Sequence, residues 1–182
     1  MKVYNEEYKG HEIEIHIDED YGDFFDNQDV FSKFVCFHRR YDLGNDKRFS
    51  SPDEVNHYIN THKKTVKAFP LYMYDHSGLT ISLSPFSCPW DSGQLGYVLI
   101  EADDVKKEYG VKRITEKTWN KAISLMRSEV ETYDKVLRGD VYGFVVTDKD
   151  GNDVDSCWGF IGDIDDVVKE AKGFIDYESK KE

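Results

Sequence analysis

Residues 69–100, FPLYMYDHSGLTISLSPFSCPWDSGQLGYVLI, constrain the fold more than any other stretch of the chain. They hold three of the four prolines but only two of the 36 acidic residues. Within residues 79–84 apolar and polar side chains alternate, a period of two that is typical of a strand with one buried face. The runs at residues 69–74 and 94–101 have the same character, and turn-forming residues separate the three runs. The stretch therefore predicts three consecutive strands of one sheet.

The remaining segments add strands with few helices between them. One helix stands out, because apolar residues recur every three or four positions from Trp119 to Leu137 and form a single stripe. Strands that follow one another in this way predict an α+β fold, with a mainly antiparallel sheet on which the long helix and two or three short helices pack. The further strands expected are residues 11–17, 30–38, 140–147 and 153–160, and the short helices are residues 51–61, 103–109 and 163–174.

The length of 182 residues predicts a single α+β domain over residues 1–182. Residues 1–29 would form an acidic N-terminal strand and loop, and residues 175–182 a frayed tail. Three widely separated cysteines do not suit a disulfide framework and predict free thiols in a reducing compartment. No apolar signal run follows Met1, and no stretch approaches the ~18 apolar residues of a membrane span. We therefore expect a soluble, cytoplasmic protein with no membrane contact.

The formal net charge of −12 is concentrated at the two ends of the chain. Residues 1–29 carry ten acids and two bases, and residues 148–182 carry eleven acids and five bases. A general nucleic-acid binder needs clustered Lys and Arg to neutralise phosphates, so this charge argues against that class. It favours either a basic protein partner or no role beyond solubility.

The most acidic segment, residues 18–29, also holds Tyr21, Phe24 and Phe25. Aromatic side chains in an acidic loop either pack back into the core or anchor a partner. Six carboxylates of the segment are our candidates for partner binding. They are Asp18, Glu19, Asp20, Asp23, Asp26 and Asp29.

The two loops of the central stretch bring acid, imidazole and thiol into one neighbourhood. Asp75, His76, Cys88 and Asp91 are therefore candidate catalytic residues, with a carboxylate that orients a histidine and a histidine that activates a thiol. Against this interpretation, Asp75 and His76 are adjacent in sequence, and Cys88 follows no helix start that would lower its pKa. Dense Pro, Gly, Ser and Trp are also what a rigid structural loop requires.

Two metal sites can be considered and set aside, so we expect no metal and no cofactor. The segment 148–155 has spaced carboxylates, but its glycine is fourth rather than sixth, which fits a hairpin turn better than a calcium loop. Cys36, His38, Cys88 and Cys157 could supply zinc ligands, but they lack the closely spaced pairs that structural zinc sites use.

Four sequence strings resemble a group of small proteins carried by phages and other mobile elements of gut Firmicutes, a group with no assigned chemistry. They are CFHRRYDLGN (36–45), YDHSG with SPFSCPWDSGQLG (74–96), RSEVETYDKVLRGDVYGF (127–144) and DSCWGFIG (155–162). The likeness covers about residues 30–162 and leaves the acidic N-terminal segment outside it. In length and acidity the chain is also similar to the type II-A anti-CRISPR proteins, which are phage-encoded inhibitors of Cas9.

This resemblance implies a non-enzymatic inhibitor whose partner is Cas9 or the Cas9–guide RNA complex, in the cytoplasm of a bacterial host. The six carboxylates of residues 18–29 would then occupy the positively charged surfaces with which Cas9 holds nucleic acid. Arg39 and Arg40 would either touch phosphate and give weak DNA contact, or pair with a carboxylate of the chain such as Asp42 or Asp75. The alternative is a hydrolase, or another enzyme acting on nucleic acid or nucleotides, with its site in the loops from Asp75 to Gln94.

Overall fold

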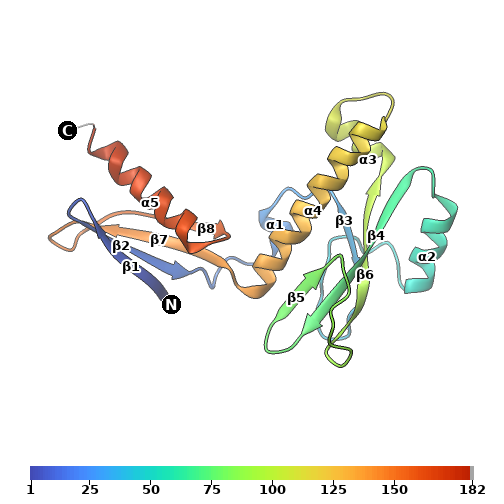
Figure 1. The fold of residues 1–182 in the computed structure, drawn as a ribbon, viewed down its shortest axis with the longest axis horizontal. Helices are drawn as coiled ribbons and strands as arrows, with labels where there is room; N and C mark the ends of the chain where they lie inside the picture. The colour runs from blue at the N-terminus through green and yellow to red at the C-terminus, as the bar shows by residue number, and fades with distance from the viewer. Residues whose placement is uncertain (181–182) are drawn as a thin grey trace. The chain divides into compact units, whose positions relative to one another are not determined.

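The computed structural model describes residues 1–180, and the chain divides into two compact units (Figure 1). The terminal unit comprises Met1–Phe24 and Lys135–Glu182, and the central unit comprises Phe25–Asp134. The predicted α+β class, with antiparallel strands and one long helix, is confirmed. The strands of the described residues form two four-stranded sheets, one in each unit, rather than the one sheet that we expected.

The terminal unit is an antiparallel sheet with a helix on one face. Its strand order is β1-β2-β7-β8, and helix α5 packs against β2 and β7. The elements are β1 (Lys2–Tyr8), β2 (His11–Ile17), β7 (Val141–Thr147), β8 (Asp153–Ile161) and α5 (Ile164–Glu178).

The core of the terminal unit follows from the sequence HEIEIHI of β2. Ile13 and Ile15 are fully buried beneath the apolar stripe of α5, while the side chains between them lie on the opposite face of the sheet. Helix α5 continues to Glu178 and buries Ile175, so it extends past the expected start of a frayed tail at residue 175. The last two positions of that tail, residues 181–182, lie outside the described residues.

Strand β1 was not expected from the sequence. Its residues KVYNEEY are almost all exposed because β1 is an edge strand, so they show little of the apolar alternation that marks a half-buried strand. By contrast, the hairpin between β7 and β8 forms as predicted. The Asp148 carboxylate accepts hydrogen bonds from the backbone N–H groups of Asp150 (2.8 Å) and Asn152 (2.9 Å), which closes the turn.

The central unit is built on a second antiparallel sheet, with strand order β3-β6-β4-β5. Its strands are β3 (Lys33–Cys36), β4 (Val66–Asp75), β5 (Leu79–Ser82) and β6 (Ser92–Glu101), so the three strands predicted from residues 69–100 are confirmed. The helices are α1 (Phe24–Asn27), α2 (Pro52–Thr61), α3 (Ala102–Tyr109) and α4 (Glu116–Arg138).

Both faces of the central sheet are covered by helices. This explains why the sequence around β3 is a nearly continuous apolar run. Phe34 packs edge-to-face on Tyr133 of α4, with ring centroids 5.6 Å apart. The next residue, Val35, points to the other face and joins a buried cluster with Val55 of α2. Figure 1 shows α4 and α2 on opposite sides of this sheet. Burial on two faces therefore removed the period-two signal here.

Candidate functional site

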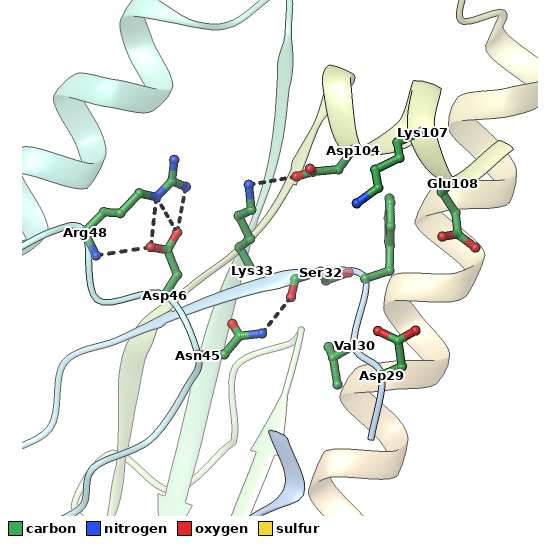
Figure 2. Close-up of a pocket in the computed structure, with 11 residues that line it drawn as sticks. Asp29, Val30, Ser32, Lys33, Asn45, Asp46, Arg48, Asp104, Lys107 and Glu108 are labelled. Carbon is green, nitrogen blue, oxygen red and sulfur yellow. Dashed lines mark hydrogen bonds and ion pairs between the residues drawn. The ribbon is translucent and has the colours of Figure 1, made fainter. Parts of the chain in front are cut away.

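A pocket of about 660 Å³ opens beside β3 in the central unit (Figure 2). Its walls come from residues 29–33 at the entry to β3, from Asn45, Asp46 and Arg48 of the following loop, and from α3. Seven of its eleven lining residues are charged. Such a wall suits a charged or strongly polar ligand rather than an apolar one.

The basic side chains on one wall of the pocket are held by ion pairs. Arg48 Nη2 lies 2.7 Å from Asp46 Oδ2 and 2.7 Å from Glu101 Oε1. Lys33 Nζ lies 2.8 Å from Glu101 Oε2 and 2.7 Å from Asp104 Oδ2. Figure 2 shows the Asp46–Arg48 and Lys33–Asp104 pairs facing the pocket. These two cations are thus already matched by three carboxylates of the chain.

Glu101 is the centre of this network. Its burial favours the neutral acid and is the largest single influence on its pKa. Hydrogen bonds from Lys33, Arg48 and Tyr58 together outweigh that effect and lower the pKa of Glu101 to about 2. The same pairing raises the pKa of Arg48, so both groups are charged over the whole physiological range. The network therefore fixes one wall of the pocket.

Glu129, on α4, is a buried carboxylate that the sequence analysis did not single out. Its oxygens accept the backbone N–H groups of Phe31 (2.6 Å) and Ser32 (3.1 Å), which line the pocket. Burial raises the pKa of Glu129, and these hydrogen bonds oppose the rise. The sequence did contain a sign that Glu129 is buried. Position 129 falls three residues after Met126 and four before Tyr133, so it lies on the apolar stripe of the helix. A carboxylate on such a stripe needs a buried partner.

The four candidate catalytic residues of the central loops do come close together, but not in the expected order. His76 Nδ1 lies 3.2 Å from Asp91 Oδ2, and Cys88 Sγ lies 3.9 Å from the same oxygen. Asp91 is therefore the neighbour of both the imidazole and the thiol, whereas an activated cysteine needs the imidazole between the thiol and the acid. Asp75 is engaged elsewhere, in an ion pair with Arg40.

These loops border a hollow of about 310 Å³, lined among others by Arg40, Asp75, Trp90 and Asp91. Trp90 is 90% exposed, the most exposed large apolar side chain of the described residues. The hollow thus combines an ion pair, a carboxylate and an uncovered indole. It offers contacts to a ligand, but no assembled nucleophile.

The two arginines differ in their surroundings. Arg40 pairs with Asp75, one of the two carboxylates expected for it, and its guanidinium carbon lies 5.3 Å from the centre of the Tyr41 ring. Asp42, the other expected partner, pairs with Lys47. Arg39 is exposed to solvent.

The six candidate carboxylates of residues 18–29 divide between the units, with Asp18, Glu19, Asp20 and Asp23 in the terminal unit and Asp26 and Asp29 in the central unit. Asp18 is half-buried and the other five are exposed. Phe24, in contrast, is buried, and Phe25 packs on Tyr133 with ring centroids 4.8 Å apart. These two aromatic residues therefore pack back into the core.

The acidity of the chain belongs almost entirely to the terminal unit. That unit carries 20 acidic and 9 basic residues, while the central unit carries 16 and 15. Of the net charge of −12, −11 therefore lies in the terminal unit and −1 in the central unit. The sequence showed two acidic ends, but not that both ends fold into the same sheet.

Neither metal site considered from the sequence forms. No group of three or more His, Cys, Asp or Glu side chains within residues 1–180 is placed to hold a metal ion. The three cysteines are free thiols, and Asp148 is engaged in its own turn. Of the described helices, none combines the length and the apolar character that a membrane crossing requires.

Comparisons with known proteins give no relative on which a function could rest. The chain matches no family model, no curated protein sequence and no solved structure.

Proposed function

We propose that the protein is a non-enzymatic inhibitor of a Cas9-type nuclease and that it acts by direct binding through an acidic surface. The observation that carries the proposal is the concentration of charge, −11, in the terminal unit, where Asp18, Glu19, Asp20 and Asp23 lie together in one short segment. Cas9 holds nucleic acid in positively charged channels and reads its PAM through arginines. A surface of exposed carboxylates is complementary to such a channel.

The resemblance to proteins of phages and mobile elements supports this function, and host-cell cytoplasm would be the place of action. The contacts of Asp91 support a binding role as well, because the thiol and the imidazole share one carboxylate oxygen and do not form a nucleophile–base pair.

The test is co-purification with, and inhibition of DNA cleavage by, several Cas9 orthologues. A variant that neutralises the six carboxylates of residues 18–29 (Asp to Asn, Glu19 to Gln) should lose inhibition, and inhibition by the unchanged protein should weaken at raised salt. The matched control neutralises six exposed acids elsewhere, so that both variants lose the same charge. They are Asp103, Glu116, Glu131, Asp150, Asp165 and Glu170.

The two parts of the proposal fail separately. Inhibition that survives neutralisation of residues 18–29 would contradict the acidic mechanism. An unchanged protein that neither co-purifies with any orthologue nor blocks its cleavage would contradict the inhibitor function itself.

A hydrolase acting on nucleic acid or nucleotides is the second candidate, because Cys88 and His76 meet at Asp91 beside the hollow of about 310 Å³. Cys88→Ser and His76→Gln would each abolish such an activity on oligonucleotide or nucleotide substrates, while an Asp42→Asn control would keep it. Activity that persists in both variants would exclude a site at these residues.

A further inference from the structure

Strand β8 is an edge strand with an open side. It pairs with β7 along one edge, and it is the last strand of the terminal sheet. Helix α5 packs mainly on β2 and β7, and near the end of β8 Phe160 joins the same cluster. Within residues 1–180, no backbone hydrogen bond reaches the other edge of residues 153–158. A row of backbone N–H and C=O groups is thus left for a partner.

The side chains of this edge are also uncovered. Of residues 153–158, all but the half-buried Asp155 are exposed. Val154 is 42% exposed and Trp158 is 48% exposed, and their spacing of four places both on the face of the sheet opposite α5. Large apolar side chains at an open edge are what a docking strand would contact.

Trp158 is held flat against the sheet by the absence of a side chain at Gly143 on β7. A Cβ atom at position 143 would lie 2.3 Å from Cε3 of the indole, so only glycine admits the ring there. The His16 ring lies at its side, with centroids 6.1 Å apart. The indole is therefore seated on one face while the other face stays accessible to a ligand.

The charged side chains of this edge strand are all acidic. β8 has two carboxylates, Asp153 and Asp155, and no basic residue. Neither forms an ion pair with a described lysine or arginine, so both charges are available to a partner. Asp155 pairs with Val146 and so lies on the face that α5 covers, whereas Asp153 pairs with Thr147, whose neighbour Glu12 is on the open face. On the open face, Glu14 is already paired with Lys2 (2.8 Å), and its other oxygen lies 2.9 Å from His16 Nε2.

Carboxylates on an edge strand discriminate between occupants. They repel an acidic strand, and they repel a second copy of this chain, whose β8 carries the same two carboxylates. They attract a strand that carries arginine or lysine. Arginine fits better, because its guanidinium also stacks on an indole face.

We propose that the open edge of β8, from Asp153 to Trp158, binds an extended arginine-bearing segment of a protein partner as a fifth strand of the terminal sheet. Backbone hydrogen bonds would supply the pairing, and alternate side chains would supply the specificity. Arginines on the open face of the sheet contact Asp153, and one of them stacks on Trp158, whereas Asp155 attracts the segment from the face that α5 covers. This proposal goes beyond the inhibitor function, since it uses no residue of the segment 18–29 and can be tested without a nuclease.

The test uses the full chain and a capped heptapeptide, Arg-Val-Arg-Thr-Arg-Val-Arg. Replacing Trp90 and Trp119 by Phe leaves Trp158 as the reporter of binding. The peptide should change the Trp158 emission in a saturable way and slow the hydrogen exchange of amides in β8. A peptide with glutamate in place of arginine should not bind. The arginine peptide methylated at alternate backbone nitrogens should bind at least tenfold more weakly, because it cannot form the ladder.

Charge reversal provides the matched pair of protein variants. Asp153→Lys with Asp155→Lys should weaken binding at least tenfold, while Asp103→Lys with Glu131→Lys, exposed in the central unit, should leave it within about twofold. Hydrogen exchange of β7 in each variant shows whether the sheet has kept its pairing.

Three outcomes would overturn the proposal. Equal affinity for the methylated and unmethylated peptides would mean charge attraction without strand pairing. Equal affinity of both charge-reversed variants would remove the role of Asp153 and Asp155. A dimer in sedimentation that Asp155→Lys disrupts would assign the edge to a second copy of this chain.

Discussion

At the scale of single residues, the three cysteines lie in different surroundings and should react at different rates. Burial raises the pKa of Cys36 to about 12, so almost no thiolate exists there at neutral pH. Cys88 is half-buried, while Cys157 is exposed on β8. We expect an aromatic disulfide reagent to label Cys157 first and Cys36 only after unfolding, as followed by absorbance and mass spectrometry.

The control for this order is Cys157→Ser, which should remove the fastest phase and leave the others. If Cys88 instead reacted faster than Cys157, the thiol would be activated and the enzymatic candidate would gain support. Rapid labelling of Cys36 in the folded protein would contradict its burial.

Gly96 and Gly93 form a natural comparison on the same strand, β6. A Cβ atom at Gly96 would lie 1.9 Å from the carbonyl oxygen of Val35 on β3, so Gly96→Ala must displace the backbone of a paired strand. At Gly93 no atom lies within 4 Å of the added Cβ. We expect Gly96→Ala to lower the free energy of unfolding by about 2–4 kcal/mol and Gly93→Ala to change it by less than about 1 kcal/mol. Urea unfolding measures both, and equal effects would contradict the close approach of β3 and β6.

At the scale of elements, α2 depends on a cap that the sequence already predicted. The Ser51 side chain accepts the backbone N–H of Glu54 (3.4 Å), and Pro52 occupies the first turn. Ser51→Ala should therefore cost about 1 kcal/mol, with loss of helical signal in circular dichroism. Ser50→Ala is the control, because Ser50 contributes only its backbone N–H, to Glu54. A cost shared equally by both variants would show that the cap does not stabilise the helix.

Elements were predicted well where a few consecutive residues carry the pattern that identifies the helix or strand. β2 carries its period of two in seven residues, and α2 carries its cap, proline and acids in four. β1 was missed because an exposed edge strand buries too little to need apolar alternation. The division into two sheets was missed because which strands pair is decided by contacts between segments far apart in the chain, such as β2 with β7.

The candidate sites were less accessible to prediction for the same reason. The pocket of Figure 2 takes its charged walls from three segments, so no single stretch of sequence carries it. The contact of His76 with Asp91 joins the two loops of the central stretch, and the sequence placed these residues in one neighbourhood. It could not decide which atom would face the thiol, because that depends on the path of both loops.

At the scale of the whole molecule, the distribution of charge separates two roles. The terminal unit carries nearly all of the net charge, and both proposed binding surfaces draw on it, through Asp18–Asp23 and through β8. In the central unit acids and bases nearly balance, and its carboxylates are used in pairs such as Glu101 with Arg48. The proposed binding roles therefore depend on the excess of acids over bases in the terminal unit, an excess that the central unit lacks.

The response of stability to pH should follow from two carboxylates, the half-buried Glu101 and the buried Glu129, whose pKa values shift in opposite directions. The pKa of Glu101 is lowered to about 2 in the folded protein, so its contribution is fully present above its unfolded value of 4.5 and is lost as pH falls toward 2. The pKa of Glu129 is raised by burial, so its contribution is present below 4.5 and is lost as pH rises through its folded value. The two effects therefore fall in different pH ranges, that of Glu101 between about 4.5 and 2 and that of Glu129 above 4.5.

Glu101→Gln separates them, because it removes one of the two titrations and keeps the shape of the side chain. At pH 7 we expect this variant to be less stable than the unchanged protein by up to about 3 kcal/mol, since Lys33 and Arg48 lose a charged partner. The difference should shrink as pH falls from about 4.5 toward 2, where Glu101 itself becomes neutral. Urea unfolding at pH 7, 4 and 2.5 measures it, with the exposed Glu131→Gln as control. A difference that stays constant over this range would mean that the Glu101 network does not control acid stability.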